Sequence, residues 1–219
     1  QLTLRRMFME MFYLIGFYNY TVWLTYLSLV SSMVGIYYAL DGKLLTAVIL
    51  LMFSGLCDMF DGIVARTKKD RTDEERSYGI QLDSLCDVVC FGAFPAIIGY
   101  CIGADAWWQI AIMAFFALAG LIRLAYFNVT EESRQKVETG KRKFYMGVPI
   151  SVSPLVVALA FCFRNSLSHG GFTVLYTLLL LANGIAFIAP VKVKKPGKKG
   201  LVTIIVTGIA IGVLMVVLW

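Results

Sequence analysis

Hydrophobic residues occur in seven long blocks along the chain, and most polar residues gather between the blocks. Each block is close to the roughly 20 residues that a helix needs to cross the hydrocarbon core of a membrane. The pattern therefore predicts seven membrane-spanning helices, over residues 21–40, 44–66, 78–101, 106–127, 146–164, 171–190 and 201–219.

Composition agrees with this pattern. Hydrophobic residues make up 59% of the chain and charged residues 16%, whereas soluble domains have about 45–50% and about 25%. The chain is therefore predicted to be an all-α integral membrane protein. Residues 1–20 are less uniformly apolar: they carry Arg5, Arg6, Glu10 and Asn19 among several aromatic side chains. This mixture predicts an amphipathic helix that lies along the membrane surface before the first span.

The basic residues fall in alternate loops. Basic residues precede the first block, and basic clusters lie between the second and third, the fourth and fifth, and the sixth and seventh, whereas the opposite loops carry only Lys43 and Arg164. Loops rich in Lys and Arg stay in the cytoplasm. The N-terminus is therefore predicted inside and Trp219 outside. The net charge of +6 is interpreted as a topology signal and an attraction to anionic headgroups, not as a sign of nucleic-acid binding.

Four aspartates interrupt the second and third blocks: Asp58, Asp61, Asp83 and Asp87. A carboxylate within a span costs at least about 2.5–3.5 kcal/mol and commonly marks a functional site. Asp58 and Asp61 are three apart, and Asp83 and Asp87 four apart, so each pair shares one helix face. Asp61 and Asp83 lie at similar depths, roughly 7.5 Å inside the ends of their spans at the helical rise. An antiparallel helix pair would bring all four carboxylates together near the cytoplasmic surface.

Four converging carboxylates need positive charge to remain ionised. A set of oxygen ligands without histidine favours Mg²⁺ or Mn²⁺, and four carboxylates have room for two ions. The cysteines form no CxxC pair, and the one histidine, His169, is placed at the opposite membrane face, so a Cys/His zinc site is not expected. A pair of divalent ions typically acts on phosphoryl oxygens.

The same residues form a longer motif. Asp58-x-x-Asp61-Gly62-x-x-Ala65-Arg66, followed by Gly79-x-x-x-Asp83-x-x-x-Asp87, resembles the signature of the CDP-alcohol phosphotransferases in every fixed position. The connector between Arg66 and Gly79 has twelve residues, more than the family commonly has. We expect a longer cytosolic loop with the site intact, and the tip of this loop could touch substrate.

Other segments resemble the phosphatidylserine synthase branch of that family. They are Leu82–Ala96, Arg123–Asn128, Phe144–Ile150 and Val191–Pro196. Near the first span the likeness is weaker: Thr25 matches the threonine of a Pro-Asn-x-x-Thr pattern, but Val22 stands where asparagine would be. The resemblance implies a six-helix catalytic domain over residues 21–196, with 1–20 as a juxtamembrane segment and 197–219 as an additional span. It also suggests a homodimer.

The resemblance further implies transfer of a phosphatidyl group from CDP-diacylglycerol to L-serine, giving phosphatidylserine and CMP. Asp58, Asp61, Asp83 and Asp87 would hold the metal ions, and Asp87 would also be the general base. The nucleotide and its diphosphate would lie against a set of motif residues and one threonine: Asp58, Gly62, Ala65, Arg66, Gly79 and Thr25. Candidates for binding the acceptor are Arg123, Asn128 and Lys143. Arg123 is also long enough simply to reach toward the headgroups.

Three other interpretations stay open at this point. A sister enzyme using glycerol phosphate or inositol phosphate would share the aspartate motif. A cation transporter would also need intramembrane carboxylates, although the outer halves of the second and third spans carry no ionisable residue. The acidic cluster of a membrane scaffold would be purely structural.

Overall fold

The computed structural model describes residues 16–65, 67–68, 70–137, 144–194 and 197–219. The predicted surface helix over residues 1–20 lies mostly outside the described residues, and so do Arg66 and Lys143. The described part is dominated by long apolar helices, which confirms the all-α membrane class.

The helices and strands follow one another along the chain with short connections. In order they are η1 (Tyr20–Val22), α2 (Trp23–Leu40), α3 (Leu44–Ala65), α4 (Asp73–Asp87), the π-helical turn η2 (Val88–Ala93), α5 (Phe94–Cys101), α6 (Trp107–Val137), β1 (Phe144–Met146), η3 (Ile150–Val152), α7 (Ser153–Phe161), α8 (His169–Ile188), β2 (Lys192–Lys194) and α9 (Lys198–Leu218).

Six of the seven predicted spans correspond to helices long and apolar enough to cross a membrane. These are Tyr20–Leu40, Leu44–Ala65, Asp73–Cys101, Trp107–Arg134, His169–Ile188 and Gly200–Leu218. The third span starts earlier than predicted because a capping box formed by Thr72 and Glu75 begins α4 in the polar connector.

The predicted fifth span, residues 146–164, is wrong in length. Its helical part is the shorter apolar helix Ile150–Phe161. Before it, residues up to Met146 pair as β1 with β2, and Gly147 turns the chain with a φ of 74°. A side chain on Gly147 would put its Cβ 2.1 Å from the carbonyl oxygen of Phe187. Hydropathy alone does not separate such a strand and turn from a helix.

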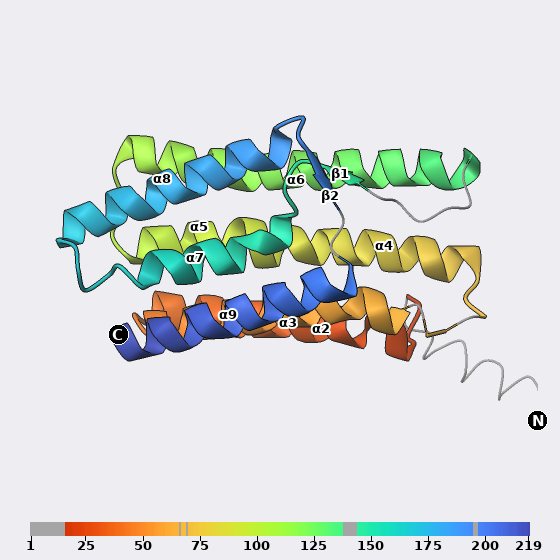
Figure 1. Cartoon of the computed structure of the whole chain (residues 1–219), viewed down its shortest axis with the longest axis horizontal. Coiled ribbons are helices and arrows are strands. Elements are labelled where there is room, and N and C mark those ends of the chain that lie inside the picture. The colour runs from red at the N-terminus through yellow and green to blue at the C-terminus, as the bar shows by residue number, and fades with distance from the viewer. Residues whose placement is uncertain (1–15, 66, 69, 138–143, 195–196) are drawn as a thin grey trace, which may run out of the picture.

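The helices form three layers (Figure 1). One layer holds α2, α3 and α9, the middle layer holds α4, α5 and α7, and the third holds α6 and α8. The helices α4 and α5 continue through η2 as one rod, from which Phe91, Phe94 and Ile98 are fully buried. The core of the bundle therefore surrounds the rod that also carries Asp83 and Asp87.

The last helix, α9, lies at the edge of the bundle against α3 and α7. Only 6% of the apolar stretch of α9 is buried inside the protein, compared with 50% of the apolar stretch of the rod Asp73–Cys101. An apolar helix so little covered by protein fits a lipid-facing position.

Candidate metal and phosphoryl-transfer site

The last turns of α3 carry the first half of the site. Ser54, Asp58 and Asp61 recur at helical spacing on one side of α3. Ser54 is fully buried, and Asp58 and Asp61 are half-buried. This face of α3 therefore runs from the packed interior of the bundle to its polar end.

The second half of the site lies on α4, whose start is fixed by its own sequence. Thr72 caps the helix, and Asp73, Glu74 and Glu75 occupy its first turn, where negative charge interacts favourably with the helix dipole. Asp83 follows in the third turn, and Asp87 ends the helix with 9% of its surface exposed. The π-helical turn begins at the next residue, and such turns are frequent at functional sites.

The structure brings the predicted aspartates together. Carboxylate oxygens of Asp58, Asp83 and Asp87 all lie within 4.8 Å of one another. Across the two helices, Asp58 lies beside Asp87 and Asp61 lies beside Asp83. These four residues are called the acidic cluster below.

Several neighbouring side chains contact the acidic cluster or act on it through their charge. The hydroxyl of Thr25, a predicted site residue, donates to Oδ2 of Asp61 over 3.2 Å. Asp58 interacts with Ser151 and with the guanidinium of Arg123. Arg123 also lies over the ring of Phe127, 5.6 Å from its centroid. The predicted acceptor residue Arg123 is thus close to the carboxylates, and α2 and α6 contribute to the site as well as α3 and α4.

Asn128 is linked to the acidic cluster indirectly, through Ser84. Its side-chain amide donates to the hydroxyl of Ser84 over 2.9 Å, and Ser84 follows Asp83 on α4. Asn128 was predicted to contact the acceptor, whereas here it ties α6 to the helix that carries Asp83. Ser151 was not singled out from the sequence, because its place against Asp58 depends on how η3 packs.

The donor set fits a hard divalent cation. Carboxylates only accept hydrogen bonds. Among the described residues, Thr25 and Ser151 bring hydroxyl groups to the cluster, and the guanidinium of Arg123 brings positive charge. One guanidinium does not balance four carboxylates. All-oxygen clusters of this kind suit Mg²⁺ or Mn²⁺.

The small residues of the motif lie at the polar ends of the two helices. Gly62 is exposed, and a Cβ built on it meets nothing within 4 Å. Ala65 ends α3. Gly79 is different, because a Cβ there would lie 2.5 Å from Nη2 of Arg71. The predicted slot is therefore open at Gly62 but covered at Gly79 by an arginine from the connector.

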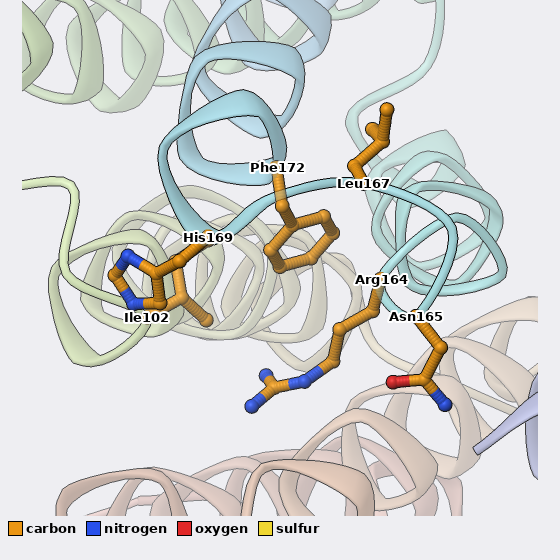
Figure 2. A pocket seen from close by; sticks show the side chains of 6 residues that line it. All are labelled: Ile102, Arg164, Asn165, Leu167, His169 and Phe172. Atoms are coloured by element: carbon orange, nitrogen blue, oxygen red, sulfur yellow. The ribbon is translucent and has the colours of Figure 1, made fainter.

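A pocket of about 190 Å³ lies elsewhere, where α5 ends and α8 begins (Figure 2). Its lining residues are Ile102, Arg164, Asn165, Leu167, His169 and Phe172. Ile102 is fifteen residues beyond Asp87 on the same rod, which corresponds to about 20 Å at the helical rise. This pocket is thus separate from the acidic cluster.

Residues that line this pocket contact the C-terminal end of α9. The guanidinium of Arg164 lies 4.8 Å from the Trp219 ring centroid, and the amide of Asn165 donates to the carbonyl of Leu218 over 2.7 Å. These contacts hold α9 against the connection between α7 and α8.

Comparison with known families agrees with the motif. Residues 18–219 match the family described as CDP-alcohol phosphatidyltransferase. The chain belongs to this family. Members are generally dependent on divalent metals, and the three mutually close carboxylates provide a matching ligand set.

Individual relatives carry serine-related names. A CDP-diacylglycerol–serine O-phosphatidyltransferase of Saccharomyces cerevisiae is 41% identical over 116 residues, covering 52% of this chain and 41% of the relative. An archaetidylserine synthase of Methanothermobacter thermautotrophicus is 32% identical over 163 residues, 73% of this chain and 66% of the relative. A CDP-diacylglycerol–serine O-phosphatidyltransferase of Helicobacter pylori is 28% identical over 169 residues, 75% and 67% respectively. The matches thus span less than half of the yeast relative and about two thirds of the others.

Proposed function

We propose that this protein transfers a phosphatidyl group from CDP-diacylglycerol to the hydroxyl of L-serine. The observation that carries the proposal is the convergence of Asp58, Asp83 and Asp87 within 4.8 Å in a chain of the CDP-alcohol phosphatidyltransferase family. The choice of serine rests on the names of the relatives. The reaction forms a bond between the serine oxygen and the phosphatidyl phosphorus, breaks the bond from that phosphorus to CMP, and yields phosphatidylserine.

The four aspartates would hold one or two Mg²⁺ or Mn²⁺ ions. When bound, these ions supply positive charge to the diphosphate and to the departing CMP. Asp87 is the most buried of the four aspartates, with 9% of its surface exposed, and we assign it as the base that receives the proton of the serine hydroxyl. Thr25 orients Asp61, and the Ser84–Asn128 pair orients the turn that carries Asp83.

Arg123 would position the acceptor. Its guanidinium interacts with Asp58, so a serine bound beside it would bring its hydroxyl toward the acidic cluster. A guanidinium also offers paired donors to a carboxylate, which serine has and glycerol does not. The arrangement would favour an anionic acceptor over an uncharged alcohol, and the choice of serine over a phosphorylated alcohol rests on the names of the relatives.

We assign the reaction to the cytoplasmic membrane surface. The basic loops are predicted on the side where α3 ends and α4 begins. The carboxylates lie in the last turns of α3 and in the half of the α4–α5 rod that starts on that side. The acyl chains of CDP-diacylglycerol would remain in the cytoplasmic leaflet while its diphosphate enters the site from the side. Residues 21–196 would form the catalytic domain, with 197–219 as an added span, in a homodimer.

The test is CMP release by the purified full chain with CDP-diacylglycerol and Mn²⁺ or Mg²⁺. Serine, glycerol 3-phosphate and inositol phosphate are offered separately. We expect release only with serine, and a fall of at least about 100-fold in Asp87→Asn, since a positioned base contributes about 10²–10⁴-fold. Asp41→Asn is the matched control, because Asp41 is exposed and pairs with Lys43 outside the site.

Each other outcome is informative. Release with another acceptor alone would retain the phosphoryl chemistry and overturn the choice of serine. If none of the three acceptors gave release, or if Asp87→Asn retained full activity, the proposed reaction or the role of Asp87 would be rejected.

A further inference from the structure

We propose that Arg71, in the long connector between α3 and α4, binds a phosphoryl oxygen of the cytidine nucleotide. This inference rests on the proposed function and adds a ligand contact outside the aspartate motif. Arg71 lies within the twelve residues that separate Arg66 from Gly79. The connector would thus be part of the substrate site, rather than a passive loop.

The connector is held in a defined shape at its α4 end. Nζ of Lys68 pairs with Oε1 of Glu75 over 2.8 Å, and the amide of Asn19 donates to the same oxygen over 3.2 Å. Glu75 also closes the capping box with Thr72. Arg71 therefore lies in a turn that these contacts hold in place, which limits the directions that its side chain can take.

The guanidinium of Arg71 spans the two helices that carry the acidic cluster. Nη2 donates to the carbonyl of Glu75 on α4 over 3.1 Å, and Nη1 donates to the carbonyl of Ala65 at the end of α3 over 3.5 Å. Nη2 also lies where a Cβ on Gly79 would come within 2.5 Å. The absence of a side chain at Gly79 is thus what lets this guanidinium lie against α4.

One donor of this guanidinium has no acceptor. Among the described residues, Nε of Arg71 is buried and makes no hydrogen bond. A buried donor without a partner costs about 1–3 kcal/mol, more for a charged group. The cost is recovered if an anionic oxygen binds there, and guanidinium groups bind phosphate oxygens well.

The position of Arg71 identifies the anion. The guanidinium lies between Ala65 and Gly79, one helical turn before Asp83 on α4. It therefore borders the proposed diphosphate site, and Gly62 leaves open space on the α3 side. A nucleoside phosphate reaching the acidic cluster would pass its phosphoryl groups next to Nε.

The first experiment measures CMP affinity by calorimetry on the purified full chain with Mn²⁺. Arg71→Gln and Arg71→Lys are compared with Arg76→Gln, a matched control because Arg76 is exposed on α4. We expect both Arg71 variants to weaken CMP binding about 10- to 100-fold, the range of a charged hydrogen bond. The control should keep wild-type affinity, and the KM for CDP-diacylglycerol should rise while that for serine stays constant.

A second variant tests whether the position of the guanidinium, and not only its presence, matters for CMP binding. Gly79→Ala retains the arginine but displaces its guanidinium, so it should weaken CMP binding like Arg71→Gln, and the double variant should lose no more than either alone. Unchanged CMP affinity in Arg71→Gln would overturn the inference, as would a lowered Tm with affinity intact. If either result were found while wild-type protein still released CMP with serine, the role of Arg71 would be rejected and the proposed function retained. The proposed function itself is rejected only if wild-type protein releases no CMP.

Discussion

Two polar clusters lie one helical turn apart on the same face of α3, and they are built differently. The first joins Ser54 to Ser28 and Ser32 of α2, with oxygen–oxygen distances of 2.7 and 2.9 Å. The second is the acidic cluster around Asp58. The serine cluster is buried in the bundle, whereas the acidic cluster lies at its polar end.

The difference is one of hydrogen-bond chemistry. A hydroxyl is both donor and acceptor, so the serines bond to one another, and Ser28 also donates to the carbonyl of Ser54 and to the sulfur of Cys90. Carboxylates accept only, and the described donors around them are few. A polar cluster that is complete by itself holds helices together, whereas a cluster with excess acceptors needs a cation from outside. The candidate functional site is therefore distinguished by its excess of hydrogen-bond acceptors over donors, and not by polarity alone.

The largest expected effect comes from removing one carboxylate. Asp83→Asn keeps the side-chain shape but replaces a charged ligand next to Asp58 and Asp87. CMP release should fall by at least about 1,000-fold, since electrostatic stabilisation of the transferring group contributes most of such catalysis. Ser54→Ala, on the neighbouring cluster, should stay within about twofold of wild type in the same assay. Equal losses in both variants would erase the distinction between the clusters.

The next largest expected effect is on thermal stability when a divalent metal is added. Mn²⁺ at about 100 times its Kd should stabilise the folded chain by about 2.7 kcal/mol, seen as a rise in Tm that chelation reverses. Ser54→Ala should show the same rise, from a lower starting Tm. Asp58→Asn should show little or none, and a full rise in that variant would place the ion elsewhere.

A smaller effect is expected at the edge of the acidic cluster. Asn128→Ala removes the 2.9 Å bond to Ser84, worth about 1 kcal/mol. The kcat for CMP release should fall roughly fivefold through misplacement of Asp83. Asn128→Asp offers an acceptor to the Ser84 hydroxyl and should restore part of the rate. Identical kcat values for the alanine variant and wild type would show that Ser84 needs no support from α6.

The smallest effect belongs to the serine cluster itself. Ser54→Ala leaves the hydroxyls of Ser28 and Ser32 without their shared partner, at a cost of about 0.6–1 kcal/mol in a membrane bundle. Thermal unfolding in detergent should show a modestly lowered Tm. A change in KM for either substrate would connect this cluster to catalysis, contrary to its assignment as structural.

Sequence predicted the convergence of the aspartates because two local rules suffice for it. Helical spacing puts each pair on one face, and two helices that are joined directly by one polar connector pack as antiparallel neighbours. Thr25 was predicted as a site residue from the family motif, but its contact with Asp61 was found only in the structure. By contrast, the fifth span was predicted too long because Met146 and Gly147 are apolar or small but belong to a strand and a turn.

Ser151 and Arg71 were missed as site residues for a related reason. Ser151 reaches Asp58 only through the packing of η3, and Arg71 covers Gly79 only because the capping box folds the connector back. Neither arrangement leaves a periodic signal in the sequence. The one usable sign was the length of the connector, which indicated an added role without naming a residue.

The central claim is that the acidic cluster is a divalent-cation site, and Mn²⁺ electron paramagnetic resonance tests it without relying on catalysis. Purified wild-type protein and Asp83→Asn are titrated with Mn²⁺, with Ser54→Ala as the control. We predict saturable binding of one or two ions per chain in wild type and Ser54→Ala, and at least a tenfold loss of affinity in Asp83→Asn. Undiminished binding in Asp83→Asn, or no saturable binding in wild type, would contradict the account.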